Sequence, residues 1–309
     1  MNIQHYLVRL YPCAWRERYE DEVLAMLEQR SLSFADGVNL LFGALDAQLH
    51  PHLGTTGMSL YERIVHMFST LCRSLLAVFC AYVGFLLAGG AFQKMTEYDE
   101  FKEAARTHSV VGLSFDLVVI GAVVALLAVM AGGLPIAITV IRSALVQKRR
   151  RPLLLLAVPI LAFAVFLGTT FFLEALDPPG THLLPVWQLF LQRGLFFGTL
   201  IVAAIVSAGS VCLAIARSEI PEKLLRYALL PFILVTISMV LMLAATIVRG
   251  LGLRTSAPRL FTGNDGIVGS STTGTWLAII IAMAIATGLS AVSLMRGFSA
   301  RSALRTARA

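Results

Sequence analysis

Charged residues are scarce in this sequence. Asp, Glu, Lys and Arg make up only 14% of the 309 residues, whereas hydrophobic residues make up 57%. Soluble proteins carry about 25% charged residues, most of them at surfaces that face water. The shortage of charge therefore argues against a soluble fold and favours a protein whose main solvent is lipid.

Cysteines and the motifs of catalysis are scarce as well. The four cysteines are dispersed along the chain, and their spacing fits neither a disulfide framework nor a metal site. The sequence has no Gly-x-Ser-x-Gly elbow for a nucleophilic serine and no glycine-rich loop for a phosphate. We therefore expect no catalytic, cofactor-binding or metal-binding residues, and we interpret the protein as non-enzymatic.

Six long windows contain no Asp, Glu, Lys, Arg or His at all. Each has 19 to 25 residues, and a helix of about 20 residues crosses a hydrocarbon core about 30 Å thick. The windows lack the alternation of barrel strands, so helices are the remaining way to satisfy the backbone in lipid. We predict an all-α polytopic membrane helix bundle at 74–294. Its six transmembrane helices are 74–92, 117–141, 153–173, 194–215, 228–248 and 276–294.

Lys and Arg are unevenly divided between the segments that join these predicted spans. With the N-terminus inside, 18 of the 25 lie on the inner side and 7 on the outer side. Positive residues are retained on the cytoplasmic side of a membrane, so we predict that both termini are cytoplasmic, in a bacterial plasma membrane. Contact with anionic lipid headgroups explains the basic run at 148–151, and nucleic acid is not an expected partner.

The residues before the first predicted span have a helical pattern. Trp15, Tyr19, Val23 and Leu27 recur every four residues and form one apolar side of a helix. We assign residues 1–57 to a small cytoplasmic helical module.

An amphipathic juxtamembrane helix is predicted at 58–73. Ser59 and Glu62 form a capping box at its start. This helix either lies in the membrane interface or continues into the first span. After the last span, residues 295–309 form a basic cytoplasmic tail.

The apolar side of the N-terminal helix has two interpretations. Such a stripe usually packs on neighbouring helices or, here, on the underside of the membrane. Alternatively, the module docks a cytoplasmic protein partner. The residues that would take part in docking are Trp15, Arg16, Arg18, Tyr19 and Glu22.

The same region carries a resemblance to a known family. The residues concerned are Leu10-Tyr11-Pro12, Trp15-Arg16-Glu17-Arg18-Tyr19, Glu22 and Leu40-Leu41-x-Gly43-Ala44-Leu45-Asp46. They resemble the N-terminal signature of uncharacterised multi-pass membrane proteins of actinobacteria and related soil bacteria. The resemblance covers about the first 50 residues. It implies a multi-pass membrane protein and brings no activity, cofactor or site residue.

Small residues recur at four-residue spacing within the predicted spans. The pairs are Gly121 and Ala125, Ala128 and Gly132, Ala204 and Ala208, and Ala284 and Gly288. Small residues let helices approach closely in lipid, so we expect these pairs to mark contacts within the bundle. A homodimer face is the alternative for any of them.

Six ionisable or metal-ligating residues lie near the predicted outer surface. They are His108, Asp116, Glu174, Asp177, His182 and Arg193. Together they would bind a divalent metal, or Asp116 and Arg193 would form an ion pair at the helix ends. The spacing fits no known metal site, so the favoured interpretation is an ordinary solvated rim.

Three functions remain open from the sequence. The first is a non-enzymatic membrane anchor or sensor whose N-terminal helices bind a cytoplasmic partner. The alternative is a permease, or the membrane subunit of a transporter with a separate ATPase chain. An intramembrane enzyme is the least favoured, because no predicted span contains an ionisable residue for acid–base chemistry.

Overall fold

The computed structural model describes residues 8–11, 13–28, 36–37, 40, 43–44, 47, 60–96, 99–148, 150–175, 186–216, 218, 220–263 and 271–306, and no strand occurs among them. The helices are α2 (Cys13–Glu28), α4 (Leu60–Thr96), α5 (Asp99–Thr107), α6 (Ser109–Val146), α7 (Arg150–Ala175), α8 (Val186–Ala216), α9 (Glu222–Ser256), α10 (Pro258–Thr262) and α11 (Thr272–Thr306). Six of them, α4, α6, α7, α8, α9 and α11, are long and apolar enough to cross a membrane. The predicted all-α polytopic membrane protein with six spans is confirmed.

Most of the spanning helices extend beyond the windows predicted for them. The apolar stretch of α4 runs over Met67–Gln93, and those of α6 and α9 run over the whole helix. The windows ended at the first ionisable residue, whereas a helix continues as long as its backbone bonds do. Residues of the window edges, Arg249 among them, are therefore parts of spanning helices.

The chain divides into two compact units, residues 1–77 with 291–309, and residues 78–290. In the first unit, Tyr11, Ala44 and Ala47 form a small core with Trp15 of α2 packed against it. Helix α4 is unbroken from Leu60 to Thr96. Of the two alternatives for this predicted helix, the described residues 60–73 have the one in which it continues into the first span.

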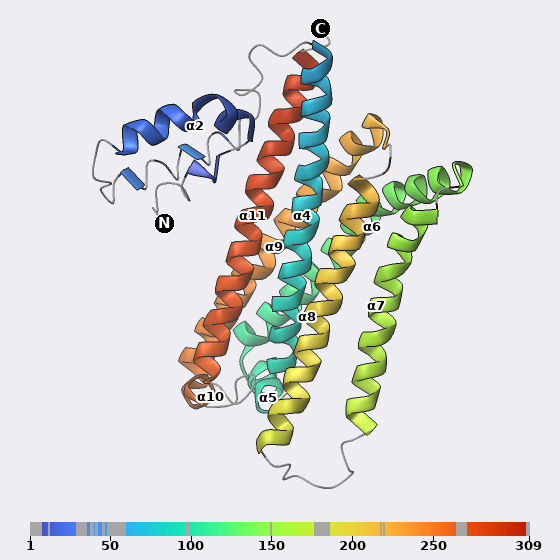
Figure 1. Ribbon diagram of the computed structural model, residues 1–309. Helices are drawn as coiled ribbons and strands as arrows, with labels where there is room; N and C mark the ends of the chain where they lie inside the picture. Colours follow the sequence, from blue (N-terminus) through green and yellow to red (C-terminus); the bar gives the residue numbers. More distant parts are fainter. Residues whose placement is uncertain are drawn as a thin grey trace. The chain divides into compact units, whose positions relative to one another are not determined.

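The core of the second unit lies between four helices, α4, α6, α9 and α11 (Figure 1). One residue or more from each helix is fully buried there, including Phe85, Ala125, Met239 and Met283. A hydrogen bond of 2.8 Å joins the hydroxyls of Thr236 on α9 and Ser290 on α11 within the same interior. The buried side chains of the four helices therefore pack on one another in this interior.

Small residues on α6 bring it close to α9. Gly121 and Gly132 are buried, and a Cβ atom on Gly121 would lie 2.6 Å from Cγ of Met242. Gly132 faces Pro231 of α9, where a Cβ would lie 3.1 Å away. The predicted contacts of Gly121, Ala125, Ala128 and Gly132 within the bundle are confirmed.

The pair Ala284 and Gly288 on α11 behaves differently. Both residues are exposed, and nothing lies within 4 Å of a Cβ placed on Gly288. The expectation that this pair packs within the bundle is wrong for the described residues. The reason is that the opposite side of α11, with Ile279, Met283 and Ala286, faces the core.

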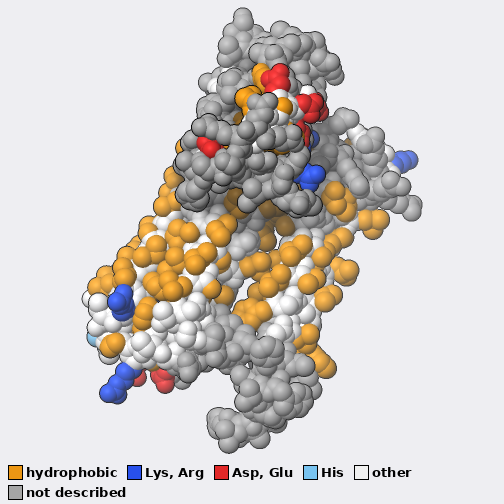
Figure 2. Space-filling view, turned by 60° about the vertical axis from the view of Figure 1, so that its left-hand side comes forward, with side chains coloured by type: hydrophobic (Ala, Val, Ile, Leu, Met, Phe, Trp, Pro, Cys, Tyr) orange, Lys and Arg blue, Asp and Glu red, His pale blue; other side chains and the backbone are white. Residues whose placement is uncertain are grey.

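Helices α7 and α8 form a hairpin beside this core, with α7 at the edge of the unit (Figure 1). None of the most apolar stretch of α7 is buried inside the protein. Figure 2 shows how apolar side chains cover the flank of the spanning helices. Such a surface is stable when acyl chains surround it.

Two short helices, α5 and α10, lie at the same end of the second unit and were not predicted (Figure 1). Helix α5 is amphipathic, with Phe101 and Ala104 buried and Lys102 and Glu103 exposed. Its buried residues share a second core cluster with Val111, Leu253 and Trp276, against which Leu260 and Phe261 of α10 also pack. The two short helices thus cover the ends of α6, α9 and α11.

Candidate functional site

A buried arginine lies toward the end of α9 that these two helices cover. Arg249 belongs to α9, is only 2% exposed and is the largest of the fully buried side chains among the described residues. It stands seven residues before the last residue of α9, which is about 10 Å along the helix axis. A buried charge of this kind in a spanning helix is costly, and such charges are commonly functional.

The guanidinium of Arg249 has few partners. Its Nη1 donates a hydrogen bond of 3.2 Å to the carbonyl oxygen of Val111 in the first turn of α6. Its Cζ lies 5.0 Å from the ring centroid of Phe115 and 5.6 Å from that of Phe92. The buried Nε has no hydrogen-bond partner, and no carboxylate of the described residues pairs with the guanidinium.

Two further donors lie buried on the first turns of α11. Trp276 is 7% exposed and Thr272 is 1% exposed, and within the described part of the chain neither the indole Nε1 nor the hydroxyl Oγ1 has a hydrogen-bond partner. The two residues are four positions apart, so they share one side of the helix. Trp276 belongs to the same buried cluster as Val111, whose carbonyl oxygen accepts the hydrogen bond from Arg249.

Glycines of α9 make this close packing possible. A Cβ on Gly250 would overlap the indole ring of Trp276, and a Cβ on Gly252 would lie 3.2 Å from Cγ2 of Val111. Phe261 of α10 closes the other edge of the indole, with the two rings T-shaped and 5.6 Å apart. The two glycines that follow Arg249 therefore bring α9 close to α11 and α6.

We call Phe92, Val111, Phe115, Arg249, Thr272 and Trp276 the Arg249 cluster. Its unpartnered polar atoms are a guanidinium N–H, an indole N–H and a hydroxyl, set among aromatic and aliphatic side chains. Such a set donates hydrogen bonds and carries positive charge. Its chemistry is that of holding an anion.

Sequence reasoning did not find this cluster. Arg249 directly follows the charge-free window 228–248, so it was counted among the outer residues. The statement that no span holds an ionisable residue is wrong for Arg249, because α9 continues to Ser256 and buries it. The signal available in the sequence was the pair of glycines that follows the arginine, together with the tryptophan at the start of the last window.

The predicted outer polar cluster is only partly described. His108 stands just before α6 and is half-buried, and Asp116 is exposed on α6. Glu174 lies on α7 and Arg193 on α8, but their side chains are outside the described part of the structure, as are Asp177 and His182 altogether. The metal site and the ion pair therefore stay predictions.

The residues predicted to dock a partner divide between the two sides of α2. Trp15 stacks on Tyr11 with ring centroids 3.9 Å apart, and Tyr19 follows at 5.4 Å from Trp15. Arg16 is half-buried, Glu22 is exposed, and the side chain of Arg18 is outside the described residues. The aromatic residues thus face the core of the module itself.

A hydrogen bond fixes the aromatic stack to the rest of the module. The hydroxyl of Tyr11 donates to the carbonyl oxygen of Leu40 at 3.1 Å. Burial raises the pKa of Tyr11 above its ordinary value of 10.0, so the hydroxyl stays protonated and able to donate at neutral pH.

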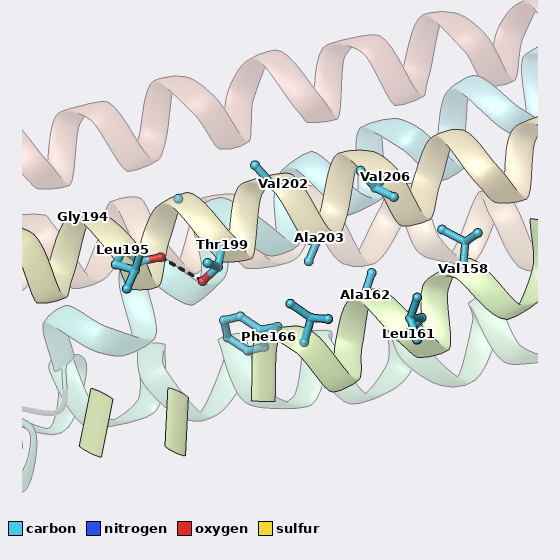
Figure 3. A pocket seen from close by; sticks show the side chains of 12 residues that line it. Val158, Leu161, Ala162, Phe166, Gly194, Leu195, Thr199, Val202, Ala203 and Val206 are labelled. Atoms are coloured by element: carbon cyan, nitrogen blue, oxygen red, sulfur yellow. Dashed lines mark hydrogen bonds between the residues drawn. The ribbon is translucent and has the colours of Figure 1, made fainter. Parts of the chain in front are cut away.

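An apolar groove runs between α7 and α8 (Figure 3). Its cavity volume is about 420 Å³, within the range of small-molecule sites. Phe166 and Ala162 of α7 face Thr199 and Ala203 of α8 across it. The Thr199 hydroxyl donates to the Leu195 carbonyl of its own helix. The groove therefore suits a lipid chain and has almost no polar group for a polar ligand.

Two cysteines come together without any signal in their spacing. Sγ of Cys80 on α4 lies 3.5 Å from Sγ of Cys212 on α8. The contact joins the hairpin to the four-helix core.

No protein-family model, curated protein or solved structure matches the chain.

Proposed function

We propose that the protein is a non-enzymatic membrane anchor or sensor whose N-terminal module binds a cytoplasmic protein with a basic surface. The observation that carries the proposal is the exposed side of α2. Glu17, Asp21 and Glu22 are exposed there, and Met26 is 63% exposed. Trp15 of α2 is already stacked on Tyr11, so among the described residues of α2 the acidic side is the one open to other molecules.

The charge of this side decides between a membrane and a protein as its partner. Asp21 follows Glu17 by one helical turn, and Met26 follows Glu22 by one turn. Anionic headgroups of the cytoplasmic leaflet repel carboxylates. A basic protein surface attracts them, and Met26 supplies an adaptable apolar contact at the end of the acidic row.

Location and orientation are part of the same proposal. The excess of Lys and Arg on the predicted inner segments supports cytoplasmic termini. A bacterial plasma membrane, and the resemblance of the N-terminal signature to the actinobacterial family, are consistent with that arrangement. In this setting the module stands in the compartment where soluble partners are found.

Charge reversal on α2 tests the proposal. The full-length protein is recovered from native membranes in mild detergent, as wild type and as the variant E17K/D21K/E22K. We expect a stoichiometric basic protein with the wild type and its loss from the variant, since three like charges now face its surface. The matched control E100K/E103K reverses two exposed carboxylates of α5 and keeps the partner.

Salt provides a second measurement that needs no variant. A complex held by exposed charges weakens between low salt and about 0.5 M, because the Debye length falls to about 4 Å and screens the attraction. Recovery of the same partner at all salt concentrations and with E17K/D21K/E22K would refute docking through the acidic side.

Arg249 favours a second candidate, a permease for an anionic solute. Intramembrane charges mark substrate pathways in transporters, and Arg249 lacks a carboxylate partner among the described residues. Proteoliposomes that hold the purified protein test this candidate by the flux of radiolabelled anions. Flux equal to that of empty liposomes would exclude it.

A further inference from the structure

We propose that the Arg249 cluster is a binding site for a small anion or an anionic oxygen group, such as chloride, a carboxylate or a phosphate. Arg249 supplies the charge, and the N–H of Trp276 and the hydroxyl of Thr272 supply further donors. The proposal concerns binding only and does not rest on the docking of a cytoplasmic partner.

Arg249 carries a charge that no carboxylate of the described residues balances. A guanidinium stays protonated in proteins, and a buried charge without a counter-charge costs several kcal/mol. The single hydrogen bond to the Val111 carbonyl and two aromatic faces recover part of this cost. An anion at the guanidinium recovers the rest, and the unpartnered Nε is a donor available to it.

Trp276 and Thr272 supply two further donors at this end of the second unit, and neither has a partner among the described residues. The ring of Trp276 lies against Gly250, the residue next to Arg249. Trp276 also belongs to the same buried cluster as Val111, whose carbonyl oxygen accepts the hydrogen bond from Arg249. Thr272 is one turn before Trp276 on the same side of α11. Buried donors are nearly always hydrogen-bonded, so two donor side chains without partners beside an unpaired cation indicate a missing acceptor.

The N-terminus of α11 is a third feature that favours an anion here. Thr272 is the first residue of this 35-residue helix, whose N-terminus carries about half a positive charge from the aligned peptide dipoles. Anions bind readily at such ends. The dipole adds to the field of Arg249 at the site where the two side-chain donors lie.

The covering helices define what can enter. Phe101 of α5 is fully buried against this end of the bundle, and Phe261 of α10 packs on the Trp276 ring. The apolar cover lowers the local dielectric constant, which strengthens the attraction between a bound anion and Arg249.

A purely structural role for Arg249 makes a different prediction. If Arg249 only ties α9 to the Val111 carbonyl, stability depends on the arginine and not on the anion in solution. Anion dependence at constant ionic strength therefore separates the two roles.

The test uses the full-length protein in a neutral detergent, with gluconate as the reference anion. Chloride, acetate or inorganic phosphate replaces gluconate at constant ionic strength, and thermal unfolding is followed. We expect at least one anion to raise Tm saturably by about 5 °C, since a ligand that binds only the folded state stabilises it by mass action. Equal Tm values with all anions would overturn the proposal.

Matched variants locate the effect. Arg249→Gln is expected to abolish the anion-dependent rise in Tm, whereas Arg254→Gln, which changes an exposed arginine of the same helix, keeps it. Trp276→Phe removes the indole N–H but keeps an aromatic ring, and Thr272→Val removes the hydroxyl at nearly constant shape. We expect each to weaken the anion about tenfold or less, as for one lost hydrogen bond.

These milder variants also cover the case in which Arg249→Gln does not fold. An unchanged anion affinity in Trp276→Phe and Thr272→Val together, or an equal loss in Arg254→Gln, would refute the assignment of the site.

A second experiment distinguishes a lipid phosphate from a dissolved ion as the source of the anionic group. Nanodiscs of phosphatidylcholine alone are compared with nanodiscs that contain phosphatidylglycerol, in gluconate throughout. A rise in Tm with phosphatidylglycerol that Arg249→Gln removes identifies a lipid phosphate as the ligand. A rise with dissolved anions in phosphatidylcholine identifies a free ion, and no rise in either arm contradicts the site.

Discussion

Helices α9 and α7 are similarly apolar, yet they lie in opposite surroundings. Half of the most apolar stretch of α9 is buried inside the protein, and none of that of α7 is. Apolar residues bring both helices into a membrane, but lipid solvates them as well as protein does. The comparison shows that hydrophobicity selects the spanning helices, whereas close packing selects which of them form the core.

The difference between the two helices lies in what faces them. Gly121 and Gly132 of α6 admit Met242 and Pro231 of α9 to close contact. A Cβ on Gly168 of α7, in contrast, would have nothing within 4 Å. Small residues pack a helix only when a partner with a complementary surface lies opposite them.

Replacing one glycine of each helix by alanine should give the largest difference in stability between changes in α9 and changes in α7. In Gly250→Ala the new Cβ overlaps the Trp276 ring, so the ring or the backbone must shift, and we expect a loss of about 3 kcal/mol of stability. Gly168→Ala should be neutral or slightly stabilising, by up to about 1 kcal/mol, because alanine favours helix. Thermal unfolding in detergent measures both, and equal effects would contradict the packing of α11 on α9.

Removing a side chain from each helix should give a smaller but similar contrast. Met242 is buried against Gly121, so Met242→Ala leaves a cavity and is expected to cost about 2 kcal/mol. Leu161 of α7 is exposed, and Leu161→Ala should cost less than about 0.5 kcal/mol. A cost for Leu161→Ala as large as that for Met242→Ala would mean that α7 is covered by protein.

The smallest expected effect concerns a hydrogen bond inside the core. Thr236 and Ser290 join α9 to α11, whereas Thr199 of α8 bonds only to its own helix. In a double-mutant cycle of Thr236→Val and Ser290→Ala, we expect a coupling of about 0.6 kcal/mol, typical of hydrogen bonds between helices in lipid. Thr199→Val is the control, and a coupling of zero would show that the two hydroxyls do not meet.

The number and place of the spans could be predicted from the sequence, because ionisable residues are expelled from lipid and their absence is visible in the letters. The contacts of Gly121 and Gly132 could be predicted for the same kind of reason, since close approach needs small residues. Ala284 and Gly288 have the same spacing and yet are exposed. The spacing shows that another helix could approach closely, but it does not show whether another helix lies opposite.

The Arg249 cluster could not be predicted from charge-free windows. Such a window ends at the first charge, so it assigns every charge to the outside. The groups that contact Arg249 come from α4 and α6, and the end of the unit where it lies is covered by α5 and α10, all of them distant from Arg249 in the chain or on another helix. Helix α5 is short and has an apolar face of two residues, Phe101 and Ala104, so its covering role becomes visible only once it is placed.

The most direct test of the proposed function is photo-crosslinking in living cells from residue 26 of the full-length protein. A photoreactive phenylalanine analogue at this exposed end of α2 is predicted to form one protein adduct of defined mass, and E17K/D21K/E22K should remove it. The same analogue at Ile120, an exposed residue of α6, should give no such adduct. The absence of a protein adduct at residue 26, or an adduct that persists after charge reversal, would contradict docking through the acidic side of α2.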